Sequence, residues 1–258
     1  MTPHEWKQLA GWVADRMKEY TRPYVTPMRT ANDYGVRLLG TGSYVAASER
    51  RILVTAEHVI RGKTEVHNQF WGLETVFHVL EPFVFDVPLD VAFAPIRSEI
   101  WNAEPHSALT ISFGRFAIKH EPLRDELLFF RGFAGENAYY GFGIHEANAT
   151  GYCSQEPHAP PLAPELFEII WKPEKMEFTS ETSDEMQKKM THADPHGLSG
   201  SLVWNTRYVE KCAADEMWRP EDAVVTGLLQ RYAAERETVV ALKVEHLRAW
   251  LEPQLAPD

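Results

Sequence analysis

The sequence has little of three features that would assign it to a class at once: cysteine, clustered basic residues and long apolar runs. Its 258 residues include two cysteines, Cys153 and Cys212. Their separation fits neither a disulfide framework nor a Cys-x-x-Cys metal or redox site, so we expect two free thiols. The net charge is −11 and the Lys and Arg residues are not clustered, which argues against nucleic acid as a partner.

No apolar run approaches the length of a bilayer span, so no membrane partner is expected. The first twenty residues have neither the basic start nor the uninterrupted apolar core of a signal peptide. We therefore expect a cytoplasmic protein. Hydrophobic residues make up 44% of the chain, which is enough to form a core without disulfides.

Helical periodicity is found near the two ends of the chain. Between residues 4 and 20, apolar side chains recur at spacings of three and four, which predicts an amphipathic helix. Its apolar positions are Trp6, Leu9, Ala10, Trp12, Val13 and Met17. The stretch KVEHLRAWLE predicts a short helix near the C-terminus, because Val244, Leu247 and Trp250 share one face.

Most of the remaining chain has the pattern of short strands. Residues 35–60 predict two strands joined by a polar turn at Ser48 to Arg51. Further apolar runs separated by Gly, Pro, Asn or Asp are VFHVLEPFVF, LDVAFAPI, ELLFFRGFAG, SLVWN, AVVTGLLQRYA and TVVALKV. Many short strands at this spacing favour antiparallel barrels or sandwiches over a parallel sheet.

The stretch GLSGS places Ser199 between glycines, directly before an apolar strand. A serine becomes a nucleophile when a base takes its proton and N–H groups hold the developing oxyanion. Gly197 and Gly200 allow the sharp backbone turn that aims such N–H groups. Taken alone, the motif fits a plain turn equally well.

Two polar residues earlier in the chain adjoin apolar strands. His58 follows the strand ILVT, and Asp90 opens the strand VAFAPI. Alone, His58 fits a satisfied core or edge histidine, and Asp90 fits a strand-start residue in a turn. The order His, Asp, Ser is nevertheless the chain order of one particular catalytic triad.

These stretches resemble the chymotrypsin-like (trypsin-fold) serine peptidases, of the bacterial and intracellular type. VTAEHV, LDVAFAPI and GLSGS are similar to the family's stretches around its His, Asp and Ser; the resemblance extends to GTGSYVA, ELLFFRGF, VTGLLQRY and VVALKVEHLRAWL. It covers residues 34–253. It implies an all-β fold of two antiparallel six-stranded β-barrels with a short C-terminal helix, preceded by the amphipathic N-terminal helix.

On this basis the chain is divided into four parts. Residues 1–30 form the N-terminal helix and an arm, and residues 31–98 form the first barrel with the His and Asp. Residues 99–124 connect it to the second barrel, residues 125–258, which carries the Ser and the C-terminal helix.

The resemblance implies a serine endopeptidase that hydrolyses peptide bonds through an acyl-enzyme. Ser199 would be the nucleophile, His58 the general base and Asp90 the residue that orients His58. The backbone N–H groups of Gly197 and Ser199 would form the oxyanion hole. The expected partner is a protein or peptide substrate; no cofactor and no metal are expected.

Alignment backwards and forwards from Ser199 implies a substrate pocket. Its floor would lie near Ala193, with His196 bordering the cleft and walls formed by Gln230, Arg231, Tyr232 and Val239. Ala193 is not acidic, although Asp194 adjoins it, and the size of Val239 would narrow the pocket. A small or medium apolar side chain is therefore the expected preference.

Some residues depart from the family pattern or leave alternatives open. Leu198 stands where secreted members carry an aspartate that pairs with a trimmed amino terminus, so activation by that route is not expected. Asp86 is a rival for the triad acid. His192 and His196 are four apart, but the neighbouring proline and glycine disfavour a helix and hence a metal pair.

Two further hypotheses concern function and its control. The chain could be a catalytically silent binding module of the same fold, since fold alone does not determine function. An α/β-hydrolase is disfavoured because Ser199 comes last of the three residues. If the protein is a protease, we hypothesise that access to its cleft is restricted, by residues 152–190 or by the N-terminal helix, to a limited set of substrates. A regulatory protein partner is a further hypothesis.

Overall fold

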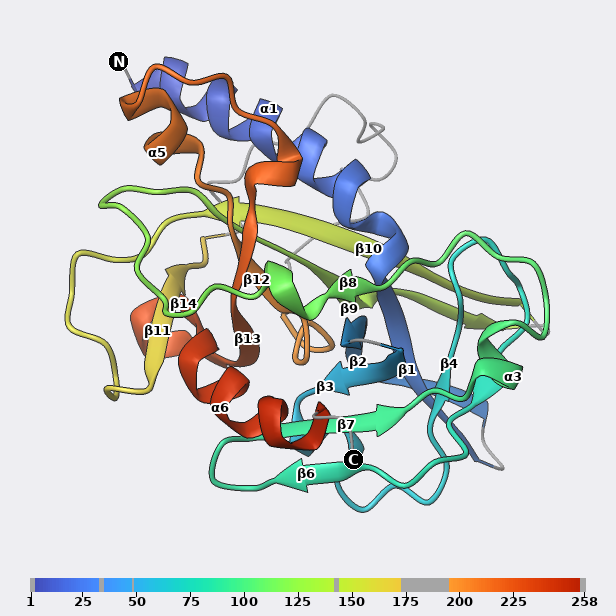
Figure 1. The fold of residues 1–258 in the computed structure, drawn as a ribbon. Helices are drawn as coiled ribbons and strands as arrows, with labels where there is room; N and C mark the ends of the chain where they lie inside the picture. Colours follow the sequence, from blue (N-terminus) through green and yellow to red (C-terminus); the bar gives the residue numbers. More distant parts are fainter. Residues whose placement is uncertain (1–2, 33–34, 48, 142–143, 173–194, 256–258) are drawn as a thin grey trace.

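Strands arranged in two curled sheets dominate the computed structural model, which describes residues 3–32, 35–47, 49–141, 144–172 and 195–255 (Figure 1). The first half of the chain builds one sheet and the second half builds the other. Both sheets are antiparallel apart from one short parallel pairing, in agreement with the periodicity of the sequence.

The first sheet has eight strands in the described part of the chain. In chain order they are β1 (Val25–Asn32), β2 (Gly35–Ala47), β3 (Arg50–Thr55), β4 (His67–Asn68), β5 (Phe77–His78), β6 (Val84–Asp86), β7 (Val91–Pro95) and β8 (Ile111–Ser112). Their spatial order is β5-β4-β1-β2-β3-β7-β6, and β8 pairs in parallel with β2. The two strands predicted within residues 35–60 are confirmed as β2 and β3, but β3 ends at Thr55 and Glu57–Ile60 are helical.

The second sheet has six strands in the described residues, as predicted. They are β9 (Leu128–Gly141), β10 (Ile144–Ser154), β11 (Leu166–Ile170), β12 (Leu202–Asn205), β13 (Val224–Ala233) and β14 (Thr238–Lys243), in the order β10-β9-β12-β13-β14-β11. The register of β13 against β14 shifts between Leu229 and Arg231, so Gln230 is a bulge residue without a partner in β14.

Helices occupy the two ends and several connections. The α-helices are α1 (Pro3–Thr21), α2 (Glu57–Ile60), α3 (Ser98–Trp101), α5 (Tyr208–Ala213) and α6 (Val244–Leu255). Single 3-10 turns are η1 (Arg22–Tyr24), η2 (Phe113–Arg115), η4 (Pro220–Asp222) and η5 (Ala234–Arg236). Within the described residues, none of the helices combines the length and the apolar character needed to cross a membrane.

The predicted N-terminal helix is confirmed as α1, which lies along β10 (Figure 1). Val13 and Met17 are fully buried, as the apolar stripe predicts. Trp12 differs from the prediction because 43% of its surface is exposed, at the rim of the contact. The helix is also tied down at its C-terminal end, where Arg131 of β9 donates a hydrogen bond to the carbonyl of Lys18 (2.8 Å).

Three apolar clusters organise the interior. One lies within the first sheet around Tyr44 and Leu53, and one within the second sheet around Phe130 and Ile169. The third joins residues of both sheets with α1 and α6. Burial of this shared cluster fixes the two sheets against each other, because separating them would expose it to water.

The helix α6 bridges the two sheets, confirming the predicted C-terminal helix. It follows β14 of the second sheet directly, yet Trp250 packs edge-on against Phe93 of β7 in the first sheet, with ring centroids 5.5 Å apart. Arg248 donates to the carbonyl of Phe116 in the connection between the sheets (2.9 Å). Helix α6 therefore packs against both halves of the molecule.

The first sheet begins earlier in the chain than predicted. The sequence places residues 25–30 in an arm, whereas Val25–Asn32 form β1, paired with β2 from Val25 opposite Ser43. Pro27 hid this strand, because proline within a run argues against a central strand. It is tolerated since β4 pairs with β1 only at Arg29. The short β4, β5 and β8 raise the strand number of this sheet above the predicted six.

Both cysteines are free thiols, as predicted. Cys212 is exposed on α5, whereas Cys153 lies on β10 beside the core. Burial of the thiol, with a smaller contribution from the Glu126 carboxylate, raises the pKa of Cys153 to about 12. This thiol therefore stays protonated and unreactive at neutral pH.

Candidate active site

The serine of the GLSGS stretch lies in a tight turn that leads into β12. Gly197 and Gly200 on either side have φ angles of 95° and 89°, in the left-handed region that favours glycine. Thr41 of β2 holds the turn from the first sheet: its hydroxyl donates to the carbonyl of Gly197 (2.8 Å) and its N–H to the carbonyl of Ser199 (2.9 Å). The turn is thus fixed by both halves of the molecule.

Two of the backbone N–H groups of this turn, those of Gly197 and Ser199, are available to a ligand, whereas those of Leu198 and Gly200 donate to the carbonyls of Pro195 (3.1 Å) and Leu229 (2.8 Å). The carbonyl of Leu198 accepts hydrogen bonds from the N–H (3.1 Å) and hydroxyl (2.6 Å) of Ser201. Because N–H and C=O point in opposite directions across a trans peptide, the N–H of Ser199 faces away from that contact. Among hydrogen bonds between described residues, the N–H groups of Gly197 and Ser199 take part in none. Such donors suit a developing oxyanion.

The serine turn packs directly against the segment that carries His58. A Cβ placed on Gly200 would lie 2.1 Å from the carbonyl oxygen of Thr41 and 3.1 Å from the backbone nitrogen of Ala56. A Cβ on Gly40 would meet the side chain of Val59 (2.7 Å) and the carbonyl of Ser199 (2.9 Å). The serine turn, β2 and the segment around His58 are distant in the sequence, yet they pack against one another.

His58 lies in the one-turn helix α2, where it is bound to Asp90 twice. Its backbone N–H donates to Asp90 Oδ1 (2.9 Å), and its ring Nδ1 lies 2.8 Å from Asp90 Oδ2. An ionised carboxylate only accepts, so Nδ1 carries the proton and Nε2 of the neutral ring is left as an acceptor. The side chain of His58 is 39% exposed, so a ligand can reach the ring.

Asp90 sits at the end of a strained turn just before β7. Its φ of 53° is uncommon for a residue with a side chain. The turn is closed by the Asp90 N–H, which donates to the carbonyl of Val87 (3.2 Å), and by the Leu89 N–H, which donates to Asp86 Oδ1 (2.9 Å). The carboxylate of Asp86, the rival acid, thus accepts a hydrogen bond within the turn, whereas the carboxylate of Asp90 contacts His58.

The hydroxyl of Ser199 points to a different acceptor in this conformation. Its Oγ donates to the backbone carbonyl of Gln230 in β13 (2.6 Å), and no hydrogen bond joins it to His58 among the described contacts. The structure therefore brings His58 and Asp90 into direct contact and places the Ser199 turn beside them. The catalytic roles of these residues and of Gly197 stay predictions.

The residues predicted to bind substrate differ in exposure. Gln230 is buried and Val239 is fully buried within the apolar cluster of the second sheet, whereas His196 and Tyr232 are exposed. Ala193 lies outside the described residues, as do its neighbours His192 and Asp194. The pocket assignments stay predictions. Because Val239 is fully buried, its side chain does not line the surface in this conformation.

Sequence reasoning did not predict the contacts of Thr41, and for Gln230 it predicted a place in the pocket wall but not the contact of its side chain. Thr41 bridges the serine turn to β2, and the side-chain amide of Gln230 donates to the carbonyl of Leu89 (2.6 Å). The one sequence signal for the first contact is the Gly-Thr-Gly stretch, whose small residues permit the close approach. Nothing in the sequence indicates the second contact.

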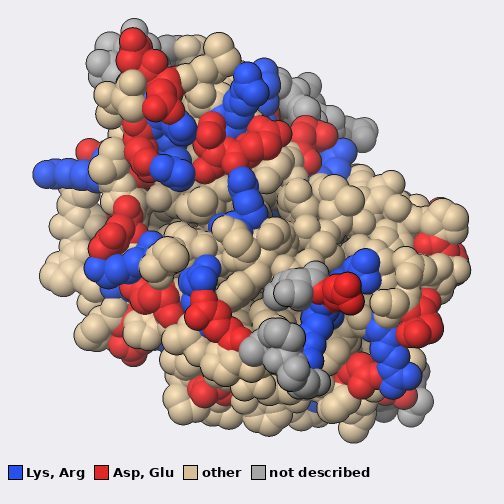
Figure 2. All heavy atoms as spheres, viewed as in Figure 1, with Lys and Arg blue, Asp and Glu red and all other residues tan. Residues whose placement is uncertain are grey.

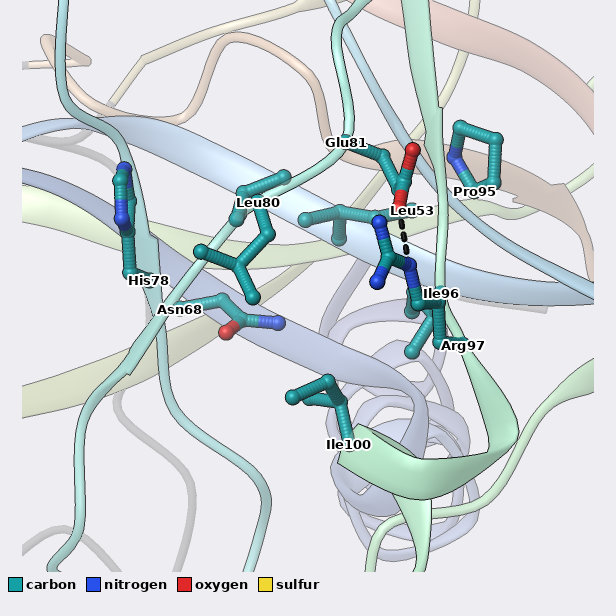
Figure 3. Close-up of a pocket in the computed structure, with 10 residues that line it drawn as sticks. Leu53, Asn68, His78, Leu80, Glu81, Pro95, Ile96, Arg97 and Ile100 are labelled. Atoms are coloured by element: carbon teal, nitrogen blue, oxygen red, sulfur yellow. Dashed lines mark hydrogen bonds and ion pairs between the residues drawn. The ribbon is translucent and has the colours of Figure 1, made fainter.

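A pocket in the first half of the molecule is too small to hold a substrate. The pocket in Figure 3, between Leu53, Asn68 and Ile100, has a volume of about 20 Å³ and is crossed by the ion pair of Glu81 with Arg97. That volume holds about one water molecule. None of the described residues form a group of three or more potential metal ligands.

Surface charge bears on the expectation that nucleic acid is not a partner, which stays a prediction. Figure 2 shows acidic and basic side chains interspersed over one face, without an extended basic region there. Binding along a phosphate backbone relies on clustered Lys and Arg.

Comparison with known proteins identifies the fold. No protein-family model matches the chain, and no curated protein sequence does. Among solved structures, the Rv3671c protease of M. tuberculosis in its active form superposes with a TM-score of 0.56 at 17% identity, over 96% of this chain and 88% of that one.

Two further solved structures agree. The serine endoprotease of Yersinia pestis gives a TM-score of 0.53 at 12% identity, over 94% of this chain and 66% of that one. The MamO protease domain of Magnetospirillum magneticum gives 0.52 at 10% identity, over 89% and 96%. The chain has the two-barrel fold of the trypsin-like serine proteases, so the predicted fold class and resemblance are confirmed. At these identities the likeness establishes fold and not activity.

Proposed function

We propose that the protein is a serine endopeptidase. Ser199 attacks the carbonyl carbon of a peptide bond while His58 Nε2 takes the hydroxyl proton, and the same proton then passes to the leaving amine. Asp90 holds the imidazole in the required tautomer. Water releases the acyl group from Ser199 in a second, equivalent half-reaction.

One observation carries this proposal: the His58 ring is fixed by Asp90 at 2.8 Å, beside a serine turn whose N–H groups at Gly197 and Ser199 donate to no acceptor among the described residues. Each element has a simpler structural explanation. Their assembly from three distant segments, in the fold of known proteases, favours acyl transfer. Rotation of the Ser199 side chain away from Gln230 would complete the arrangement.

The direct test uses a fluorophosphonate probe, which reacts with activated serines. The wild type is expected to be labelled at Ser199, as located by peptide mass spectrometry. Ser199→Ala and His58→Ala should remain unlabelled, since one lacks the nucleophile and the other its base. Ser98→Ala, in the surface helix α3, is the matched control and should be labelled like the wild type. Labelling of another residue, or none in a folded wild type, would overturn the proposal.

The competing function is a catalytically silent binding module. Its supporting observation is the hydrogen bond from Ser199 to the Gln230 carbonyl, which leaves the hydroxyl unavailable to His58. This alternative expects no probe labelling and an unchanged biological effect in Ser199→Ala. Probe labelling of the wild type and the biological effect of Ser199→Ala therefore separate the two functions.

We further propose that the enzyme processes a limited set of proteins. Residues 152–190 include the end of β10 and β11 of the second sheet, and residues 173–190 lie outside the described part. Helix α1 contacts β9 through the hydrogen bond from Arg131. The next residue of β9, Gly132, packs against Leu198 and Ser201 beside the serine turn. Slow cleavage of unfolded casein by a probe-reactive preparation would support restricted access; cleavage as fast as by digestive enzymes would contradict it.

A further inference from the structure

Gln230 occupies a bulge in β13 at the junction of the two sheets. The pairing of β13 with β14 passes from Leu229 directly to Arg231, so Gln230 is left out of the ladder. Only 4% of its surface is exposed. A bulge turns a side chain out of its regular alternation, and here it frees both the carbonyl and the side chain of Gln230 for contacts outside β14.

The carbonyl of Gln230 contacts a candidate catalytic residue, and its side chain contacts the neighbour of another. The carbonyl accepts the hydroxyl of Ser199 (2.6 Å), and the side-chain Nε2 donates to the carbonyl of Leu89 (2.6 Å), one residue before Asp90. A single residue of the second sheet thereby touches the nucleophile of its own sheet and the acid-bearing turn of the other.

The Leu89–Asp90 turn depends on such support. Asp90 has a positive φ, a conformation that persists when surrounding contacts hold it. Two of those contacts, from Leu89 to Asp86 and from Asp90 to Val87, lie within the turn itself. The Gln230 amide adds a contact from the opposite sheet, and it orients the peptide group that joins Leu89 to Asp90.

We infer that Gln230 is a positioning residue: its side-chain amide fastens the Leu89–Asp90 turn of the first sheet to the second sheet, and so holds the Asp90–His58 pair opposite Ser199. This inference rests on the proposed endopeptidase function for its effect on rate, but the geometry it describes is independent of activity. Gln230 touches neither His58 nor the carboxylate of Asp90 among the described contacts; it acts through Leu89.

The test replaces Gln230 with methionine, which preserves length and volume but has no donor. The backbone carbonyl that accepts from Ser199 is retained. Gln69→Met is the matched control, because the Gln69 amide likewise donates to a loop carbonyl, that of Leu73 (2.7 Å), in the first sheet. Gln230→Met should lower the fluorophosphonate labelling rate about tenfold or more, as small misplacements at reacting centres do. Gln69→Met should stay within about twofold of the wild type.

A second readout does not need activity. The proton between His58 Nδ1 and Asp90 gives a low-field NMR signal, which should shift or broaden in Gln230→Met and persist in Gln69→Met. An unchanged signal with an unchanged labelling rate would overturn the inference. If the wild type itself is not labelled, the proposed function fails, while the NMR comparison still decides the role of Gln230.

The wild type provides a measurement that does not depend on the folding of any variant. Side-chain amide protons of Gln230, being buried and hydrogen-bonded, should exchange with D₂O far more slowly than those of an exposed glutamine. Exchange at the rate of an exposed amide would show that the bond to Leu89 is not formed in solution, and would also overturn the inference.

Discussion

At the scale of single residues, the serine turn depends on backbone conformations that side chains rarely adopt. Gly197 and Gly200 have positive φ angles, and the carbonyls of Gly197 and Leu198 accept hydrogen bonds from the hydroxyls of Thr41 and Ser201. This arrangement fixes the direction in which the N–H groups of Gly197 and Ser199 point. Substitution at either glycine should therefore disturb the site.

Replacing Gly197 tests the oxyanion hole. Gly197→Ala should lower kcat/KM about 10²–10³-fold, because loss of one oxyanion donor has an effect of that size. The Cβ disfavours the left-handed conformation that directs the N–H. Peptide hydrolysis measured beside thermal unfolding checks this expectation. Full activity in a folded Gly197→Ala protein would mean that this N–H does not stabilise the transition state.

Replacing Gly200 tests the packing between the serine turn and the first sheet. The new Cβ would lie 2.1 Å from the Thr41 carbonyl oxygen and 2.3 Å from Thr55 Oγ1. Gly200→Ala should therefore destabilise by about 3 kcal/mol or more, through strain and overpacking together. Gly62→Ala is the control: it also has a positive φ but open space around it, so it should cost about 1–2 kcal/mol. Equal losses in urea unfolding would contradict the proposed packing.

Residue types at the site were predictable from the sequence, whereas their supports were not. His58, Asp90 and the GLSGS turn stand out because each adjoins an apolar strand in a recognisable local context. Thr41 and Gln230 act through contacts with residues far away in the chain, and neither has a local signature. Such contacts follow from how two sheets meet, which one sequence does not reveal.

At the scale of elements, α1 shows what periodicity predicts and where it stops. The apolar stripe correctly identified a helix and its buried positions Val13 and Met17. It could not reveal that Trp12 lies at the rim, since exposure there depends on the partner surface. In the same way, Pro27 hid β1 because the tolerance of a strand for proline depends on which neighbours pair with it.

A glycine within α1 gives a prediction about this element. Gly11 lies in the helix interior, and a Cβ placed on it would meet nothing within 4 Å. Gly11→Ala should stabilise the protein by about 0.5–1 kcal/mol, because alanine loses less conformational entropy on forming a helix. Urea unfolding should show a higher midpoint with an unchanged slope. A lower midpoint would mean that α1 is not helical at Gly11 or that the position is packed.

At the scale of the whole molecule, the site exists only where the two sheets meet. The first sheet supplies His58 and Asp90, the second supplies Ser199, and Thr41 and Gln230 connect them. The shared apolar cluster and α6 keep the sheets together. The sequence predicted two antiparallel barrels through strand spacing and resemblance. It did not predict how their contact orients the Ser199 hydroxyl, because that depends on side-chain packing across the interface.

The crystal structure of the wild type after reaction with a phosphonate inhibitor tests the central claim most directly. We expect phosphorus bonded to Ser199 Oγ, its oxygen about 2.7–3.1 Å from the N–H nitrogens of Gly197 and Ser199, and His58 Nε2 beside the adduct with Asp90 still behind the ring. The Ser199 side chain should have left the Gln230 carbonyl. An adduct whose oxygen faces away from both N–H groups, or a Ser199 that stays unmodified while another residue reacts, would contradict the account.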